Sequence, residues 1–464
     1  MAGLDIRGVL ADHEGQDYDL YAQTINPQFV QMLRTIGYDR LWSRAEGAYI
    51  FDSDGRRFLD MNGGFGMFNA GRNNPRIRQA LQDVLDLDTP GSVQLGVSLL
   101  PGLLGRELLK RMPERIEHCL FTNSGTEAVE AALKLGRAAA GRSRVLSASK
   151  GFHGLTLGSL SANGGAEWSE RFGPLLPEFD QVPWNDLDAL EDELKQENVA
   201  LFVVEPVQGK GVNLPATGYL EGAQELCRRY GTYFVLDEVQ TGFGRTGKMF
   251  ALEHWGLEPD IVTVSKSLSG GYIPVGACLV SKEVYDSVFD SLEHAVSHGS
   301  TFAPNDLAMA AGLATLHELD EHGLVERSAK LGNLLLERTE PFVERYDVVR
   351  EVRGLGLMWA IEFQEPEGGS RTWRMLERRQ PGIFSQLVAV PLFSEHAILI
   401  QTAGHHMNVL KGIPSLTVTE ADIEYFASAL EQTLQRAQKI PAAMMRFALK
   451  AARAGRKHTP ALVR

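Results

Sequence analysis

A lysine stands where a buried strand is expected to end, in the stretch PDIVTVSKSLSGGYIP, residues 259–274. Burying an ammonium group is costly, and loss of water lowers the pKa of the amine. Lys266 is therefore either a surface residue whose charged end reaches water or a reactive amine. A desolvated lysine amine is nucleophilic and forms a Schiff base with an aldehyde.

Two carboxylates also follow strongly apolar stretches. Glu205 ends VALFVVE and Asp237 ends TYFVLD, the latter 29 residues before Lys266. A carboxylate in such a place is rarely without a cationic partner. Under a heteroaromatic nitrogen, Asp237 would keep that nitrogen protonated, which a pyridine cofactor needs in order to accept electrons.

Two further loops offer groups for a phosphate and for a ring. Ser124-Gly125-Thr126 opens a helix, where hydroxyls and free backbone N–H groups suit an anion. A plain helix cap explains the same residues. In KGFHG, Phe152 beside His153 would stack on a planar ring. A packed loop aromatic next to a solvated histidine is the alternative.

The four features together indicate a particular cofactor more specifically than any one of them does alone. A phosphate cradle, a stacking aromatic, a buried aspartate and a lysine at a strand end together describe a pyridoxal phosphate site. In an open parallel sheet such residues meet outside the carboxyl ends of the strands.

Alternating strand-like and helix-like segments from about Pro113 to Leu279 predict that sheet, with helices on its faces. The expected strands are 118–123, 143–148, 199–206, 232–239, 260–265 and 276–281. An α/β core follows.

The two ends of the chain are expected to form one smaller domain. Residues 47–61 predict a hairpin turning at Asp54-Gly55, and LMWAIEF predicts a strand in the C-terminal third. We expect an N-terminal segment 1–75, a large domain 76–335, a C-terminal part 336–436 and a tail 437–464. The polar stretch 364–374 is either a linker or a surface loop.

Composition excludes several classes. A net charge of −13 argues against nucleic acid as a partner, and no run of eighteen apolar residues predicts a membrane span. Cys119, Cys227 and Cys278 show no CxxC spacing, so neither a disulfide framework nor a metal site is expected. The N-terminus lacks the apolar segment of a signal peptide, which favours a cytoplasmic location.

The motifs that carry these residues resemble those of class III pyridoxal-phosphate-dependent aminotransferases, in particular the ornithine, acetylornithine and ω-amine transaminase group. The resemblance extends from about Gly47 to Phe426. The matching motifs, in the family's order and spacing, are FTNSGTEAVEAAL, KGFHGLTLGSLS, VVEPVQGKG, VLDEVQTGFGRTGKMFALEHWGLEPDIVTVSKSLSGGYIPVGA and HGSTFAPNDLAMAAG.

The resemblance implies a fold type I homodimer with active sites at the subunit interface, a mostly parallel seven-stranded sheet in the large domain and a smaller α+β domain. Lys266 would bind the cofactor aldehyde, and Asp237 would pair with the pyridine nitrogen. Other implied cofactor contacts are Ser124, Gly125, Thr126 and Thr301 of the partner subunit at the phosphate, Phe152 and Val239 on the ring faces, Gln240 near the ring hydroxyl, and His153 and Glu205 in the surrounding polar network.

The implied reaction is transamination. An amine substrate displaces Lys266, and the freed amine moves a proton from the substrate carbon to the cofactor. A 2-oxo acid such as that of glutamate or alanine then takes up the amino group by the reverse steps.

Departures from the family pattern concern the substrate. Lys210 stands where many members carry the Glu of EPxQGE, and Lys411 where they carry an Arg that grips a carboxylate. A lysine would meet a carboxylate as a point charge, without the planar fork of arginine. GRNNP also replaces the family's GHxHP at residues 71–75.

These departures put ornithine-like specificity in doubt. Phe65, Met67 and Phe68 lie where family members contact substrate, and they favour an apolar amine or aldehyde. Packing of a dimer interface by the same side chains is the alternative. An ornithine or acetylornithine δ-aminotransferase stays open as a second function.

The C-terminal tail has a basic amphipathic pattern, with Ile440, Met444, Phe447 and Leu449 among lysines and arginines. It suits an anionic membrane surface or an acidic acyl carrier protein, and a solvated or dimer-packed helix is the alternative.

Two other readings stay open. The fold and the Lys-Asp pair also serve aminomutases and racemases. A non-catalytic interaction protein is the third reading, which the presence of both Lys266 and Asp237 disfavours. A nicotinamide dehydrogenase is disfavoured because no GxGxxG follows a strand and opens a helix.

Overall fold

The structure is a computed structural model that describes residues 3–437, except 94, 166, 366–373, 375–376, 379–380 and 405–406. Residues 438–464 of the predicted tail and most of the polar stretch 364–374 lie outside the described residues. Among the helices of the described part, none is long and apolar enough to cross a membrane.

A 7-stranded sheet forms the centre of the larger unit, in the order β4-β10-β9-β8-β7-β5-β6. β10 runs antiparallel to both of its neighbours, and the pairs from β9 to β6 are parallel. The strands are β4 (Ile116–Thr122), β5 (Arg144–Ala148), β6 (Phe179–Val182), β7 (Val199–Val204), β8 (Tyr233–Asp237), β9 (Ile261–Val264) and β10 (Gly276–Ser281).

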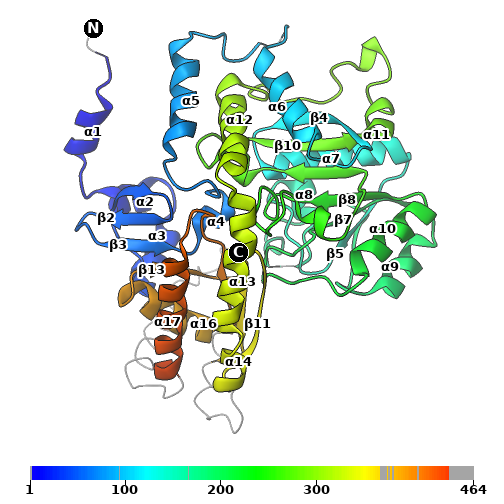
Figure 1. Cartoon of the computed structure of the whole chain (residues 1–464). Coiled ribbons are helices and arrows are strands. Elements are labelled where there is room, and N and C mark those ends of the chain that lie inside the picture. The colour runs from blue at the N-terminus through cyan, green and yellow to red at the C-terminus, as the bar shows by residue number, and fades with distance from the viewer. Residues whose placement is uncertain are drawn as a thin grey trace, which may run out of the picture.

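Helices cover both faces of this sheet (Figure 1). Successive strand residues belong to two different core clusters, as the alternation of side chains across a strand requires. The helices of this unit are α5 (Pro75–Asp86), α6 (Leu99–Leu109), α7 (Gly125–Ala140), α8 (Leu157–Ser161), α9 (Leu187–Leu194), α10 (Tyr219–Arg229), α11 (Lys282–Asp286) and α12 (Asp306–Glu321), with 3-10 turns η1 (Ala251–His254), η2 (Lys266–Ser269) and η3 (Leu292–His294).

The helix α7 packs closely on the sheet through Gly136. A Cβ added at Gly136 would lie 2.4 Å from Leu201 Cδ2 in β7, so glycine is needed for this approach. Ser124 caps the helix by accepting a hydrogen bond from Glu127 N–H at 3.3 Å, and Gly141 ends it in the left-handed conformation.

Two smaller sheets bring the ends of the chain together, at the left and bottom of Figure 1. The first has the order β1-β2-β3-β13 and the second β11-β12-β15-β14. Their strands are β1 (Trp42–Glu46), β2 (Tyr49–Asp52), β3 (Arg57–Asp60), β11 (Val349–Leu355), β12 (Met358–Phe363), β13 (Ile398–Leu399), β14 (Gln401–Thr402) and β15 (Val409–Gly412). The remaining helices are α1 (Ile6–Asp12), α2 (Asp17–Thr24), α3 (Pro27–Ile36), α4 (Gly63–Gly66), α13 (Leu324–Thr339), α14 (Phe342–Arg345), α16 (Ile383–Ser394) and α17 (Glu420–Ala437).

The expected elements agree with this arrangement at most positions. All six expected strands are present within about two residues, and the hairpin of β2 and β3 turns at Gly55, which has a φ of 79°. The short β6 was missed because its exposed polar residues show no apolar run. β13 pairs with β3, Ile398 opposite Leu59, and so joins the two chain ends. The domain boundaries themselves stay predictions.

Gly332 of the helix α13 packs directly against Gly356, in the turn between β11 and β12. A Cβ at Gly332 would lie 2.1 Å from the carbonyl oxygen of Gly356, a backbone atom that cannot move aside cheaply. Gly332→Ala is therefore expected to destabilise the protein by about 1–3 kcal/mol, as overpacked cores do. Thermal unfolding checks this. Asn333→Ala, on the exposed side of the same helix, is the control, and equal unfolding temperatures for the two variants would contradict the packing.

Candidate active site

The lysine after β9 starts the short turn η2 in a strained conformation. Lys266 has a φ of 44°, in the left-handed region, which costs a non-glycine residue about 1–2 kcal/mol. The following residues fix it, since Leu268 N–H donates to Ser265 O at 3.0 Å and Gly270 closes the turn with a φ of 60°. Observed strain of this kind marks a functional position.

The amine of Lys266 is free of hydrogen bonds within the described part of the chain. Burial lowers the pKa of this amine, and the charges of Asp237 and Glu205 act in the opposite direction. The net shift is downward, which makes the neutral and nucleophilic form more accessible than in an exposed lysine. The side chain is partly exposed but its amine is largely shielded from water, so the alternative of a lysine extending freely into solvent does not describe it.

Asp237 ends β8 and is buried in a set of hydrogen bonds. Its Oδ2 lies 2.8 Å from His153 Nδ1, and its Oδ1 accepts from Val239 N–H at 3.0 Å and from Thr263 Oγ1 at 3.2 Å. Burial would lower the pKa of His153, but the hydrogen bond and charge of Asp237 raise it, with a smaller contribution from Glu205. The net direction is upward, so His153 is the cationic partner expected for a buried aspartate.

Glu205 follows β7 and orders the neighbouring loops. It accepts backbone N–H groups from Phe152 at 2.9 Å and from Gly209 at 2.7 Å. Burial raises the pKa of Glu205, while His153 lowers it. This carboxylate therefore ties the KGFHG loop to the turn that carries Lys210.

The start of α7 is the predicted phosphate-binding segment. A Cβ on Gly125 would lie 2.9 Å from Val239 Cγ1, so glycine allows the helix start to approach Val239 closely. Thr126 Oγ1 bonds to Thr156 Oγ1 at 2.8 Å and Ser159 Oγ at 2.6 Å. The first N–H groups of the helix have no acceptor within it, as at every helix start.

Phe152 contacts Trp168, an aromatic residue that was not predicted to belong to the site. Its ring centroid lies 5.7 Å from that of Trp168 in an edge-to-face arrangement. Thr301, expected to serve the partner's site, is exposed in this single chain, and the adjacent Ser300 accepts a hydrogen bond from Asn123 Nδ2 at 2.7 Å.

Lys411 is buried on β15 and donates inward. Its Nζ donates to Gly209 O at 2.5 Å and to Gln240 Oε1 at 2.6 Å, and Gln240 Nε2 donates to Phe65 O at 3.0 Å. Burial is the main cause that lowers the pKa of Lys411 to about 7, and the charge of Lys266 adds to it. Lys411 thus links the site to the turn before Lys210.

Lys210 and Lys411 cannot form the Glu–Arg ion pair that the family pattern places at these two positions, and Lys210 pairs with a different residue. It forms an ion pair with Glu167, and both side chains are largely covered. Phe68 packs against Gly271, where an added Cβ would lie 2.3 Å from the Phe68 ring. Phe65, by contrast, is 62% exposed.

Some residues of the site carried no signal that sequence inspection would detect. They act through individual hydrogen bonds, an ion pair or a ring contact, none of which follows a spacing rule. These residues are Asn163, which accepts from His153 N–H at 2.6 Å, Thr263 on Asp237, Glu167 on Lys210, Trp168 on Phe152, and Arg353, which donates to Gly211 O at 2.8 Å.

The residues present fit pyridoxal phosphate. Within the described residues, His153 Nε2 and Ser267 Oγ are buried without a hydrogen-bond partner; His153 is bonded to Asp237, and Ser267 follows Lys266 in the chain. Such orphaned polar atoms are rare unless a ligand or water completes them. The donor set contains an amine for an aldehyde, a carboxylate for a ring nitrogen and a helix start for a phosphate.

The low pKa of Lys411 predicts a pH dependence of stability. The unfolded chain holds a proton on this lysine up to about pH 10, the folded chain only up to about pH 7. Between these values the unfolded state binds more protons, so this residue's contribution makes the free energy of unfolding rise with pH. Its slope is at most about 1.4 kcal/mol per pH unit.

Urea unfolding of the protein and of Lys411→Met at pH 7 and pH 9 checks this. We expect the variant to gain less stability than the parent between the two pH values. The exposed Lys195→Met is the control. A pH dependence that is identical in parent and Lys411→Met would show that Lys411 is not titrating abnormally.

Comparisons with known proteins identify the family of the chain. Over 445 residues the chain is 34% identical to the aminotransferase PigE of Serratia sp. (strain ATCC 39006), covering 89% of this chain and 52% of that protein. The chain therefore spans about half the length of this curated relative.

Solved structures with the same fold include the ornithine aminotransferase of Toxoplasma gondii ME49, with a TM-score of 0.80 and 26% identity over 95% of this chain and 100% of that one. An amine transaminase from an uncultivated Pseudomonas species, in its PLP-bound form, has a TM-score of 0.75 and 31% identity over 86% and 95% of the two chains. These likenesses confirm the predicted fold type I architecture. Residues 36–434 match the family model described as aminotransferase class-III, and the chain belongs to that family.

Proposed function

We propose that this protein is a pyridoxal-phosphate-dependent aminotransferase that exchanges an amino group between an amine and a 2-oxo acid. The observation that carries the proposal is the buried amine of Lys266, free of hydrogen bonds and facing the charges of Asp237 and Glu205. When bound, the cofactor supplies an aldehyde that condenses with amines and a ring that withdraws electrons.

Lys266 has two tasks in this proposal. As a nucleophile its neutral amine binds the cofactor, and once a substrate amine has displaced it, the same Nζ takes the proton from the substrate carbon. Its strained turn keeps the amine at the edge of the sheet. Loss of water around it maintains the neutral form that both tasks require.

Asp237 holds a proton on the ring nitrogen of the cofactor. The carboxylate is fixed by Val239 and Thr263 and balanced by His153, whose other nitrogen stays orphaned within the described residues. Ser124, Gly125 and Thr126 bind the phosphate at the helix start, where the helix dipole favours an anion. Phe152 and Val239 enclose the ring, Gln240 lies near its hydroxyl, and Glu205 fixes the loops around them.

We further propose an apolar amine or aldehyde as the substrate, supported by Phe65 and Phe68 on the N-terminal loop. An ornithine or acetylornithine aminotransferase is the second candidate, because one of the similar structures is an ornithine aminotransferase. The lysine at position 411 disfavours it, since its ammonium group donates hydrogen bonds to Gly209 O and Gln240 Oε1 of this chain.

A homodimer is proposed as well. Large apolar side chains are exposed in the single chain on the segments near the helix α6 and around Thr301, and exposure on this scale marks an interface. They include Leu95, Val97, Leu99, Leu292, Val296 and Phe302.

Lys266→Ala tests the reaction. We expect at least about a 10²-fold loss of amino transfer from the amine to the 2-oxo acid, because nucleophile and proton carrier are lost together. Single-turnover conversion of the reconstituted enzyme, followed by cofactor absorbance, measures it. Lys282→Ala, on an exposed lysine paired with Asp286, is the control. A Lys266→Ala enzyme that retains the rate of the parent would refute the proposal.

Phe65→Ala tests the apolar substrate. We expect kcat/KM for an arylalkyl amine to fall by about tenfold, the usual effect of removing apolar contact, with a smaller change for the 2-oxo acid. Phe29→Ala, also on an exposed aromatic but on α3, is the control. If only α,ω-diamino acids convert the cofactor, the apolar substrate is wrong and the ornithine-type activity takes its place.

A further inference from the structure

The turn after β7, residues 208–213, contains a strained valine. Val212 has a φ of 54°, in the left-handed region, and Gly211 beside it has a φ of 93°. A β-branched residue is rarely found in this region, where the conformation costs about 1–2 kcal/mol. Strain of this kind persists only where the surrounding structure over-determines it, and it collects at functional positions. The turn must therefore be held in place by its neighbours.

Part of that support comes from the turn itself and from apolar packing. Gln208 and Asn213 pair through their backbones, and Asn213 Nδ2 donates to Gln208 Oε1 at 2.9 Å and to Lys210 O at 3.2 Å. The side chain of Val212 is fully buried in a core cluster with side chains of β12 and β15. The turn is thus anchored on the second small sheet.

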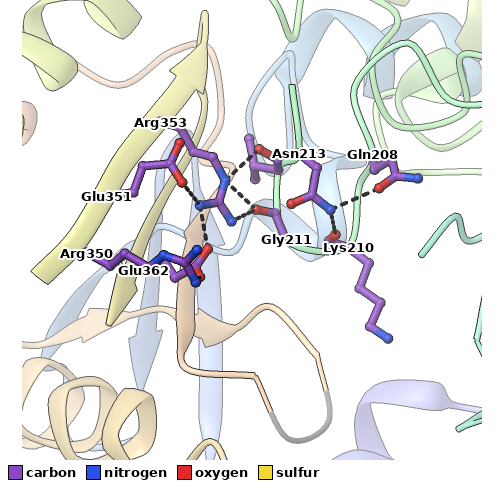
Figure 2. Close-up of polar contacts among 9 residues, drawn as sticks. Gln208, Lys210, Gly211, Asn213, Arg350, Glu351, Arg353 and Glu362 are labelled. Carbon is purple, nitrogen blue, oxygen red and sulfur yellow. Dashed lines mark hydrogen bonds and ion pairs between the residues drawn. The ribbon is translucent and has the colours of Figure 1, made fainter. Parts of the chain in front are cut away.

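An arginine of the same sheet supplies the remaining support (Figure 2). Arg353 of β11 donates to Gly211 O at 2.8 Å and to Val212 O at 3.0 Å. Its other donors pair with Glu351 at 2.8 Å and Glu362 at 2.7 Å, which balance the charge of a residue that is only 8% exposed. The planar fork of a guanidinium group can bind two carbonyl oxygens and two carboxylates at once, whereas a lysine cannot.

The same turn presents both backbone groups of Gly209 to the candidate active site. Gly209 N–H donates to Glu205 Oε2 at 2.7 Å, and Gly209 O accepts from Lys411 Nζ at 2.5 Å. A Cβ on Gly209 would lie 2.5 Å from Gln240 Oε1 and 3.0 Å from Glu205 Oε2, so no side chain fits between these groups. The position of Gly209 therefore sets where Glu205 and Lys411 lie relative to each other.

Glu205 connects this turn to the predicted cofactor contacts. Its Oε1 accepts Phe152 N–H at 2.9 Å, and the next residue, His153, bonds to Asp237 at 2.8 Å. The charge of Glu205 also acts to raise the pKa of Lys266. A displacement of the turn would loosen the KGFHG loop and change the balance of charge around the reacting amine.

We propose that Arg353 is a positioning residue for the cofactor site, which acts by holding the turn whose Gly209 binds Glu205 and Lys411. The inference rests on the proposed aminotransferase function, because the site that it positions is the one proposed to bind pyridoxal phosphate. The hydrogen bonds of Arg353 go to the turn and to two carboxylates of its own sheet. Its effect on the cofactor therefore passes through the turn.

The affinity for pyridoxal phosphate tests this without turnover. The apoenzyme of each variant is titrated with the cofactor and followed by absorbance, at a temperature where thermal unfolding shows the variant to be folded. We expect Arg353→Met to raise Kd by at least about fivefold, within the range seen for residues that act on a ligand through others. Arg350→Met is the matched control, since Arg350 lies on the same strand, pairs with Glu362 at 2.9 Å and is exposed. It should retain the parental Kd.

A double-mutant cycle with Glu205→Gln separates positioning from general damage to the fold. Glutamine has one side-chain oxygen in place of two, so it cannot accept both Phe152 N–H and Gly209 N–H where they lie. In the Glu205→Gln background we expect Arg353→Met to change Kd by less than about twofold, because the connection it acts through is already broken. General loosening would give the same factor in both backgrounds.

Parental Kd in a folded Arg353→Met variant, or equal factors in the two backgrounds, overturns the inference. If Arg353→Met does not fold, Asn213→Ala takes its place, because it releases the same turn from within, and the same outcomes decide. Neither outcome bears on amino transfer by the parent enzyme. Failure of that transfer is a separate result, which the Lys266 experiment detects.

Discussion

Removal of water from one lysine amine is the constraint on which the rest of this structure depends. A buried lysine amine must be neutral or paired with an anion. The charges of Asp237 and Glu205 raise the pKa of Lys266, but its amine has no hydrogen bond within the described residues. The apolar strand β9 delivers the amine to the sheet edge, and the strained turn after it fixes the direction. Each neighbouring loop then supplies a group that this amine or its cofactor needs.

The charges around the amine form a balanced set rather than isolated pairs. Asp237 is matched by His153, Glu205 accepts two backbone N–H groups, and Lys411 donates to a carbonyl and an amide. Because these groups come from both the large sheet and the second small sheet, the site lies where the two units meet.

Sequence inspection predicted the fold and the cofactor side of the site because both follow from patterns with physical rules. Apolar runs predict β7, β8 and β9, and residues at their carboxyl ends must converge. The substrate side follows no such rule. Lys210 and Lys411 were identified as departures, but their partners Glu167 and Gln240 depend on loop conformations that no spacing encodes. In the sequence, Arg353 has the pattern of an ordinary strand residue. Only the structure shows that it donates hydrogen bonds to Gly211 O and Val212 O.

The most direct measurement is the site of covalent attachment of the cofactor. The reconstituted enzyme is reduced with borohydride, digested and sequenced by mass spectrometry. The account predicts that the pyridoxyl group is found on Lys266 and on no other lysine in more than trace amount. A label mainly on Lys411 or Lys210, or no label on an enzyme that still transfers amino groups, would contradict it.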